Sequence, residues 1–203
     1  AGVSVGEDGP SQMGLEDIAL FRAIQGSVVL CPADAIACER LVEAIANHDG
    51  ICYMRTARPA TPVVYNQSEE FKIGGSKVIR FNDNDRVTVV ACGVALIEAI
   101  KAADELAKQN INARVIDAYS IKPIDENTLK TAAKETKAVI TVEDHYAEGG
   151  LGDAVLNVFA SDPKVKVYKL AVSKMPMSGR PQELLDYEEI SEKAIIKKVL
   201  EIL

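Results

Sequence analysis

"RVTVVACGVALIEAIKAADELAKQ" occupies residues 86–109 and decides the fold class. Its first part, 86–92, is an almost continuous apolar run, which predicts a buried strand that is closed by Gly93. The second part, 94–108, repeats apolar side chains at helical spacing, at Leu96, Ile100, Ala103 and Ala107. A buried strand that runs into an amphipathic helix of this length is typical of a layered α/β fold with a largely parallel sheet.

The same alternation continues toward the C-terminus. Apolar runs predict three further strands, at 113–119, 138–144 and 164–172. The segments around them predict three helices, at 125–135, at 149–160 and from Ser191 onward. Asp125 and Ser191 are good N-cap residues, because their side-chain oxygens can accept a free N–H of the first helical turn. Residues 86–203 therefore predict a complete three-layer α/β/α domain with a mostly parallel sheet.

Toward the N-terminus the pattern is shorter. It predicts a helix at 14–24 entered through Pro10 and Ser11, a strand at 27–31, a helix from Asp34 to about Asn47, and a strand at 51–55. Two strands are too few for a stable sheet flanked by helices. Residues 1–60 thus predict a truncated, Rossmann-like α/β segment.

Residues 56–86 interrupt the alternation. They contain two prolines, a Gly-Gly pair and a polar tip at 82–85. Such a composition predicts an extended segment or a hairpin, and also a domain boundary. We therefore expect a first domain at 1–60, a linker at 61–85 and a second domain at 86–203.

Composition and charge exclude several classes of function. The 203-residue chain has a net charge of −7 and an isoelectric point near 5.0, so it repels polyanions and nucleic-acid binding is not expected. No apolar run approaches the roughly 18 residues that a membrane helix needs. The four cysteines show no CxxC spacing, and neither His48 nor His145 is near a pair of cysteines, so we expect reduced thiols in a cytosolic protein and no zinc site.

The stretch "VGEDGPSQM" (5–13) concentrates polar chemistry near the first residue. Gly6 and Gly9 allow a sharp turn around Glu7 and Asp8, and Pro10 can then start a helix whose free N–H groups favour negative charge. A helix N-terminus with acidic capping is common in proteins, and this pattern alone specifies no reaction.

Five motifs in order resemble the transketolase family. They are "GVSVGEDGPSQM" with "LEDIALFR" (2–22), "CPAD" (31–34), "ICYMRTARP" (51–59), "SIKPID" (120–125) and "TVEDHYAEGGLGDAV" (141–155). The resemblance covers essentially the whole chain. It implies the C-terminal part of a transketolase, namely the end of the pyrimidine-binding domain followed by the C-terminal domain.

The resemblance also implies a chemistry. In this family a ketose phosphate gives a two-carbon ketol unit to thiamine diphosphate, and an aldose phosphate takes it up, as a step of the pentose phosphate pathway. Asp8 corresponds to an acid that binds a sugar hydroxyl, Gln12 to a residue near cofactor and substrate, and Arg55 to the arginine that binds the sugar phosphate. Structural alternatives remain: Asp8 can cap a helix, and Gln12 can be an ordinary first-turn residue. We expect Arg58 to pair with a nearby acid and Glu7 to hold the turn.

The stretch "EDHYAEGGLG" (143–152) resembles a catalytic or anion-binding corner. Two acids and a histidine lie at a predicted strand end, just before a helix that begins with glycines. A lone GGxG is weak evidence for a ligand. We expect a structural role instead, with the glycines at 149–152 allowing close helix–sheet packing and His145 in a hydrogen-bonded corner.

Several parts of the family's machinery match no residue here. The resemblance implies that the catalytic glutamate, the diphosphate-binding domain, its metal ligands and a substrate histidine lie before Ala1. We therefore expect no catalytic residue and no metal site in this chain, which by itself is expected to be inactive and to hold no cofactor. In the intact enzyme, thiamine diphosphate with Mg²⁺ or Ca²⁺ lies between two subunits, so we expect a homodimer that includes the N-terminal diphosphate-binding region.

Two other functions remain open at this point. The first is a fragment of deoxyxylulose-phosphate synthase, a relative with a similar GEDGP-type turn that usually has His where Gln12 stands. The second is a non-catalytic assembly or regulatory subunit, although a start inside a motif argues against a natural subunit. Whether the truncation is natural, proteolytic or engineered also stays open.

Overall fold

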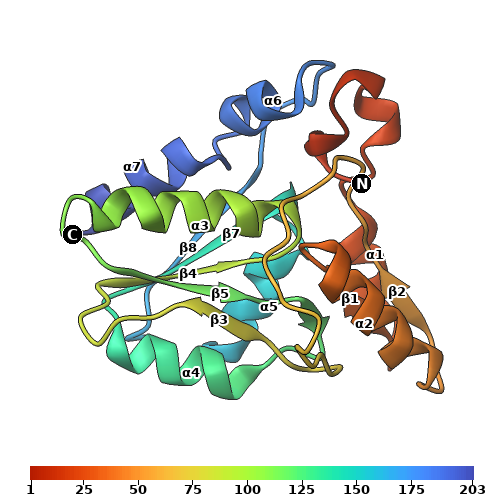
Figure 1. The fold of residues 1–203 in the computed structure, drawn as a ribbon, viewed down its shortest axis with the longest axis horizontal. Coiled ribbons are helices and arrows are strands. Elements are labelled where there is room, and N and C mark those ends of the chain that lie inside the picture. Colours follow the sequence, from red (N-terminus) through yellow and green to blue (C-terminus); the bar gives the residue numbers. More distant parts are fainter.

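A computed structural model describes all 203 residues and contains two sheets (Figure 1). The larger sheet has five strands, in the order β3 (Lys77–Arg80), β5 (Ala113–Asp117), β4 (Val87–Ala91), β7 (Val139–Tyr146) and β8 (Val167–Val172). β5, β4, β7 and β8 run parallel, whereas β3 is an antiparallel edge strand. The predicted, mostly parallel α/β sheet is confirmed.

Helices cover both faces of this sheet (Figure 1). On one face lie α3 (Val94–Ala107), α6 (Pro181–Tyr187) and α7 (Glu192–Ile202), and on the other lie α4 (Glu126–Glu135) and α5 (Leu151–Val158). Neighbouring residues of β4 point to opposite layers, because side chains alternate along a strand. Val89 joins the core cluster of α3 and α7, whereas Val90 joins the cluster of α4 and α5.

The smaller sheet has three short strands, in the order β2 (Cys52–Met54), β1 (Val28–Leu30) and β6 (Ser120–Lys122). β1 pairs with β2 in parallel, as expected, but β6 reaches it from the C-terminal half of the chain and pairs antiparallel. α1 (Asp17–Ala23) and α2 (Ala35–Ala46) pack on opposite sides of β1. The third strand therefore completes a sheet that the first 60 residues leave too small.

Helix N-caps agree with the sequence at two places. Asp34 caps α2 by accepting the N–H of Ala37 at 2.7 Å, and Asp125 caps α4 by accepting the N–H of Thr128 at 3.1 Å. The helix predicted at 14–24 begins only at Asp17, so its predicted entry at Pro10 and Ser11 is wrong. The chain first closes a loop that holds two short 3-10 helices, η1 (Val3–Asp8) and η2 (Pro10–Gln12).

The segment expected to be a linker, 61–85, contains β3, which belongs to the larger sheet. The division of the chain at 60 and 86 stays a prediction. No helix is both long and apolar enough to cross a bilayer. All four cysteines are free, and Cys31 and Cys92 are buried.

Candidate functional site

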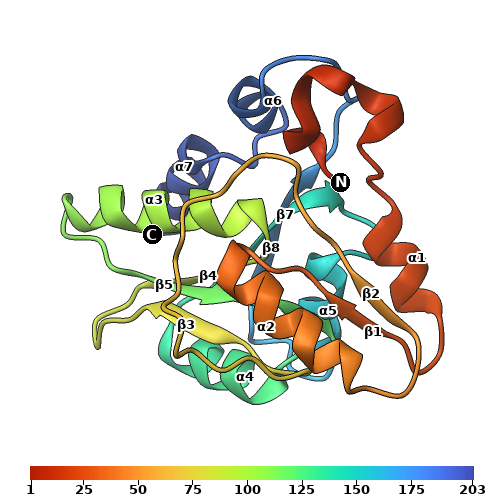
Figure 2. The same ribbon diagram turned by 45° about the vertical axis from the view of Figure 1, so that its right-hand side comes forward.

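The loop Gly2–Met13 carries the acidic motif. Gly6 and Gly9 adopt φ values of 80° and 83°, which supply the sharp turn that the sequence predicts around Asp8. The N–H of Gly2 donates to the carbonyl oxygen of Met13 at 2.5 Å and closes the loop. η1 packs against α6 and the end of β7, so elements from the C-terminal half surround the motif (Figure 2).

Asp8 and Arg58 form an ion pair at the surface. Asp8 ends η1, whereas Arg58 follows β2, so the fold brings together two charges from separate segments. Their side chains are 36% and 62% exposed, respectively, which leaves both charges open to solvent. Arg58 thus pairs with an acid, as expected, and its partner is the carboxylate predicted to bind a sugar hydroxyl. Gln12 is also exposed, in η2 of the same loop.

Arg55 is buried, unlike Arg58, and its guanidinium donates inward. Its Nε lies 3.0 Å from Asp17 Oδ2, one terminal nitrogen donates to the carbonyl of Asp144 at 2.7 Å, and the other to the carbonyl of Gly14 at 3.4 Å. Only 6% of the side chain is exposed. All three guanidinium nitrogens therefore have partners within the chain.

Asp17 connects this arginine to the first helix. Besides Arg55, it accepts the hydroxyl of Tyr53 at 2.5 Å. Burial raises the pKa of Tyr53, and its hydrogen bond to Asp17 acts in the same direction, so the phenol is a neutral donor. The start of α1 and the end of β2 are thereby joined through one carboxylate.

The end of β7 carries Glu143, Asp144 and His145, all buried. Glu143 accepts the N–H groups of Leu151 and Gly152 at 2.6 and 2.8 Å, at the start of α5. Burial raises the pKa of Glu143 to about 7, although these N–H donors act against the rise. All of its hydrogen bonds are to the chain itself.

His145 is a neutral hydrogen-bonding residue. Burial lowers the pKa of His145. Its Nδ1 lies 2.6 Å from the carbonyl oxygen of Tyr146, which can only accept, so Nδ1 carries the proton and Nε2 accepts the N–H of Ala19 at 3.3 Å. His145 thus lies in a hydrogen-bonded corner, as the sequence suggests.

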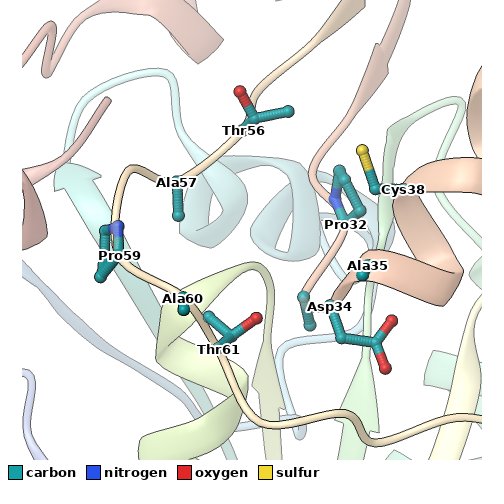
Figure 3. A pocket seen from close by; sticks show the side chains of 10 residues that line it. Pro32, Asp34, Ala35, Cys38, Thr56, Ala57, Pro59, Ala60 and Thr61 are labelled. Carbon is teal, nitrogen blue, oxygen red and sulfur yellow. The ribbon is translucent and has the colours of Figure 1, made fainter.

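A pocket of about 280 Å³ lies where β1 and β2 end (Figure 3). Segment 56–61 forms one wall, and Pro32 with the start of α2, including Cys38, forms the other. The carboxyl ends of parallel strands are where α/β folds commonly bind ligands. The Asp34 carboxylate beside it is already occupied by three backbone N–H groups, those of Ala37, Val64 and Tyr65.

Sequence reasoning overlooked the difference between Arg55 and Arg58. The string Arg-x-x-Arg-Pro offers two arginines close to one strand end, and nothing in it indicates which one the fold buries. It also overlooked Asp17 and Asp144 as the partners of Arg55. The position of Asp144 at a predicted strand end was a usable signal, since such positions gather polar contacts in α/β folds.

Comparisons with known proteins agree with this architecture. The family model for the transketolase pyrimidine-binding domain matches residues 1–63, and the model for the transketolase C-terminal domain matches residues 76–195. These matches define a two-part α/β chain of the class found in thiamine-diphosphate enzymes.

Individual relatives point the same way. The chain is 52% identical to transketolase-like protein 1 of Bos taurus over 203 residues, 100% of this chain and 34% of that protein. It is 47% identical to human transketolase over 199 residues, 98% of this chain and 32% of that protein. The chain belongs to the transketolase family, and it spans about a third of the length of these curated relatives.

Solved structures share the fold. A split-gene transketolase, described as an inactive β4 tetramer, superposes with a TM-score of 0.87 at 34% identity, covering 95% of this chain and 62% of that one. A transketolase from Campylobacter jejuni gives a TM-score of 0.79 at 18% identity, covering 98% of this chain and 30% of that one, and supports the fold alone.

Proposed function

We propose that this chain acts as part of a thiamine-diphosphate-dependent transketolase, which transfers a two-carbon ketol unit from a ketose phosphate to an aldose phosphate in the pentose phosphate pathway. The observation that carries the proposal is the exposed Asp8–Arg58 pair, whose acid belongs to the same loop as the exposed Gln12. A carboxylate, a carboxamide and a guanidinium on one surface are suited to a ligand that has both hydroxyl groups and a phosphate.

Arg58 is the better phosphate ligand of the two arginines. The nitrogens of Arg55 already donate to Asp17 and to two backbone carbonyls, so a phosphate would have to break buried contacts. An exposed ion pair such as Asp8–Arg58 contributes only about 0–1 kcal/mol, so a phosphate can replace the carboxylate at little cost. Asp8 is then free to accept a hydrogen bond from a sugar hydroxyl. We therefore assign the sugar phosphate to Arg58 and a positioning role to Arg55.

The residues of this chain fit only part of the implied cofactor. The carboxamide of Gln12 can both donate and accept hydrogen bonds. It therefore suits a polar edge of thiamine diphosphate or a hydroxyl group of the sugar substrate. No group of three or more His, Cys, Asp and Glu side chains is placed to hold a metal ion, so these residues do not fit the metal-bound diphosphate. When bound, thiamine diphosphate supplies the stabilisation of carbanionic character at the reacting carbon.

The remaining parts of the proposal concern the assembled enzyme. The diphosphate group and its Mg²⁺ or Ca²⁺ are held by the N-terminal diphosphate-binding region, in a cytoplasmic homodimer. The 203 residues alone are inactive. The β4 tetramer of the split-gene relative, described as inactive, supports this last point.

The test compares two exposed ion pairs in the full-length polypeptide that carries these residues. Arg58→Ala removes the proposed phosphate ligand, and Arg80→Ala is a matched control because Arg80 pairs with Asp104 at a distant surface. A charge-assisted hydrogen bond contributes about 1.5–3 kcal/mol, so Arg58→Ala should raise the KM for a ketose phosphate roughly 10- to 100-fold. The KM for the same ketose without its phosphate should not change.

Further assays extend this test. Asp8→Ala should lower kcat/KM for both donors, because the lost contact is to the sugar and not to the phosphate. Unchanged kinetics in both Asp8→Ala and Arg58→Ala would contradict the proposal. Activity with pyruvate as donor, and none with ketose phosphates, would instead indicate a deoxyxylulose-phosphate synthase.

A further inference from the structure

The loop Gly2–Met13 is attached at its base to the end of β7. The Asp144 carboxylate accepts the N–H of Val3 at 2.7 Å on Oδ1 and the N–H of Ser4 at 3.2 Å on Oδ2. Just beyond the other end of the loop, the carbonyl of Leu15 accepts the N–H of Tyr146 at 3.1 Å. Both ends of the loop are therefore held by the same strand end.

The contact with Asp144 is tight and desolvated. Asp144 is 3% exposed, and the first residue of the loop approaches it so closely that a Cβ on Gly2 would overlap Asp144 Oδ2. Gly2 also has a φ of 98°, which side chains rarely tolerate. Arg55 donates to the backbone carbonyl of Asp144 and fixes the strand end from the other side. A shift of Asp144 would therefore move the base of the loop.

The residues next to Asp144 hold other elements. Glu143 binds the start of α5, and His145 binds the N–H of Ala19 in α1. Successive side chains of a strand point to opposite faces, so three neighbouring residues can serve different elements. Of the three, Asp144 alone binds the loop that carries Asp8 and Gln12.

We propose that Asp144 is a positioning residue for ketol transfer, through its hold on the loop that places Asp8 and Gln12 at the substrate. This inference rests on the proposed function, and it assigns a role in the reaction to the C-terminal domain. The carboxylate touches no reacting atom. It acts because a displacement of about 1 Å at a binding group can lower a rate by roughly a hundredfold.

The test uses Asp144→Asn in the full-length polypeptide, with Glu143→Gln as the matched control. Both residues are buried carboxylates that accept two backbone N–H groups, so both substitutions turn one acceptor into a donor facing an N–H. We expect kcat/KM for the ketose phosphate to fall about 10- to 100-fold in Asp144→Asn and to stay within twofold in Glu143→Gln. Hydrogen exchange should become faster at Val3–Met13 in the first variant and at the start of α5 in the second.

A combined variant separates positioning from general damage. If Asp144 acts through the loop, adding Asp144→Asn to the double variant Asp8→Ala/Gln12→Ala should lower kcat/KM further by no more than about threefold. Additive losses would overturn the inference, and so would faster exchange of the loop with unchanged kcat/KM.

Gly2→Ala is a second way to displace the loop, in case Asp144→Asn does not fold. Its Cβ pushes against the Asp144 carboxylate without removing a buried charge, and we expect the same loss of kcat/KM. Full activity of Gly2→Ala with a loosened loop would overturn the inference. If neither Asp8→Ala nor Arg58→Ala changes the kinetics, the proposed function fails, whereas activity loss in Asp8→Ala but not in Asp144→Asn contradicts only the positioning role.

Discussion

The larger sheet is built from strands of one stretch of the chain, whereas the smaller sheet combines two strands near the N-terminus with one strand from the C-terminal half. All five strands of the larger sheet lie between residues 77 and 172, and helices cover both of its faces. The smaller sheet combines β1 and β2 with β6, which follows β5 in the chain. Its strands have three residues each, and β2 is only half-buried. The comparison indicates that the smaller sheet depends on contacts with the larger one.

Two contacts hold the smaller sheet in place, and the second of them joins it to the larger sheet. β6 brings Lys122, whose Nζ donates to the carbonyls of Arg22 and Ile24 at the end of α1 at 2.9 and 2.5 Å. Arg55, directly after β2, donates to the carbonyl of Asp144 at the end of β7. The first contact holds the far end of α1, and the second joins the strand ends at the candidate site.

The largest expected effect comes from Arg55, because it joins the sheets and is buried. Arg55→Leu leaves Asp17 as an uncompensated, mostly buried carboxylate, and breaking a buried ion pair in this way costs about 3–5 kcal/mol. Arg58→Leu, three positions along, should change stability by no more than about 0.5 kcal/mol because the side chain is exposed. Hydrogen exchange at the amides of β1 and β2 measures the loss of stability in both variants. Equal losses in Arg55→Leu and Arg58→Leu would show that Arg55 does not join the sheets.

A pair of leucines tests whether the sheets unfold separately. Leu96 and Leu41 are both fully buried, the first in α3 over the larger sheet and the second in α2 over the smaller. Either Leu→Ala change should cost about 2–5 kcal/mol. If the smaller sheet depends on the larger, Leu96→Ala lowers hydrogen-exchange protection in both sheets and Leu41→Ala only in residues 28–54. Loss of protection throughout the chain in both variants would show a single cooperative unit.

The smallest expected effect is a pH dependence at the boundary between the sheets. Asp117 ends β5, is fully buried, and accepts the hydroxyl of Tyr65, which belongs to the core of the smaller sheet. Burial raises the pKa of Asp117 to about 7. The native state therefore keeps a proton that the unfolded chain loses near pH 4, so this residue's contribution to stability falls as the pH rises from about 4 to about 7.

The change over that whole range is at most about 4 kcal/mol, at about 1.4 kcal/mol for each unit by which the pKa is raised. Asp117→Asn removes the titration, so urea denaturation at pH 5 and pH 8 should show a smaller loss of stability in the variant than in the parent. The exposed Asp83→Asn is the control and should leave the difference between the two pH values unchanged. An identical pH difference in Asp117→Asn and the parent would show that Asp117 is ionised throughout.

Much of the fold could be predicted from local patterns. The run at 86–92 became β4, and the helical spacing at 94–108 became α3. Besides the 3-10 helices η1 and η2, three elements were not predicted: β3, β6 and α6. β6 has three residues before Pro123, and α6 has seven, which is too short for a clear periodic pattern. β3 is an edge strand that exists because β5 offers it a partner.

At the candidate site, too, the features set by neighbouring residues were predicted, whereas those set by distant contacts were not. The sequence indicated the turn at Gly6 and Gly9 and the acid that it presents, since both follow from neighbouring residues. It favoured Arg55 over Arg58 as the phosphate ligand, and that assignment stays untested, although the structure buries Arg55 and exposes Arg58.

The sequence by itself determined the element types, the helix caps at Asp34 and Asp125, and the family, because each depends on residues that are close in the chain. Only the tertiary structure decided which strand completes the smaller sheet, which arginine is buried, and that Asp144 holds the loop of Asp8. These are pairings between segments far apart in the chain. Local propensity carries no information about such partners. A buried charge or an unpaired strand edge needs a hydrogen-bonding partner, and the packing of the layers decides which residue supplies it.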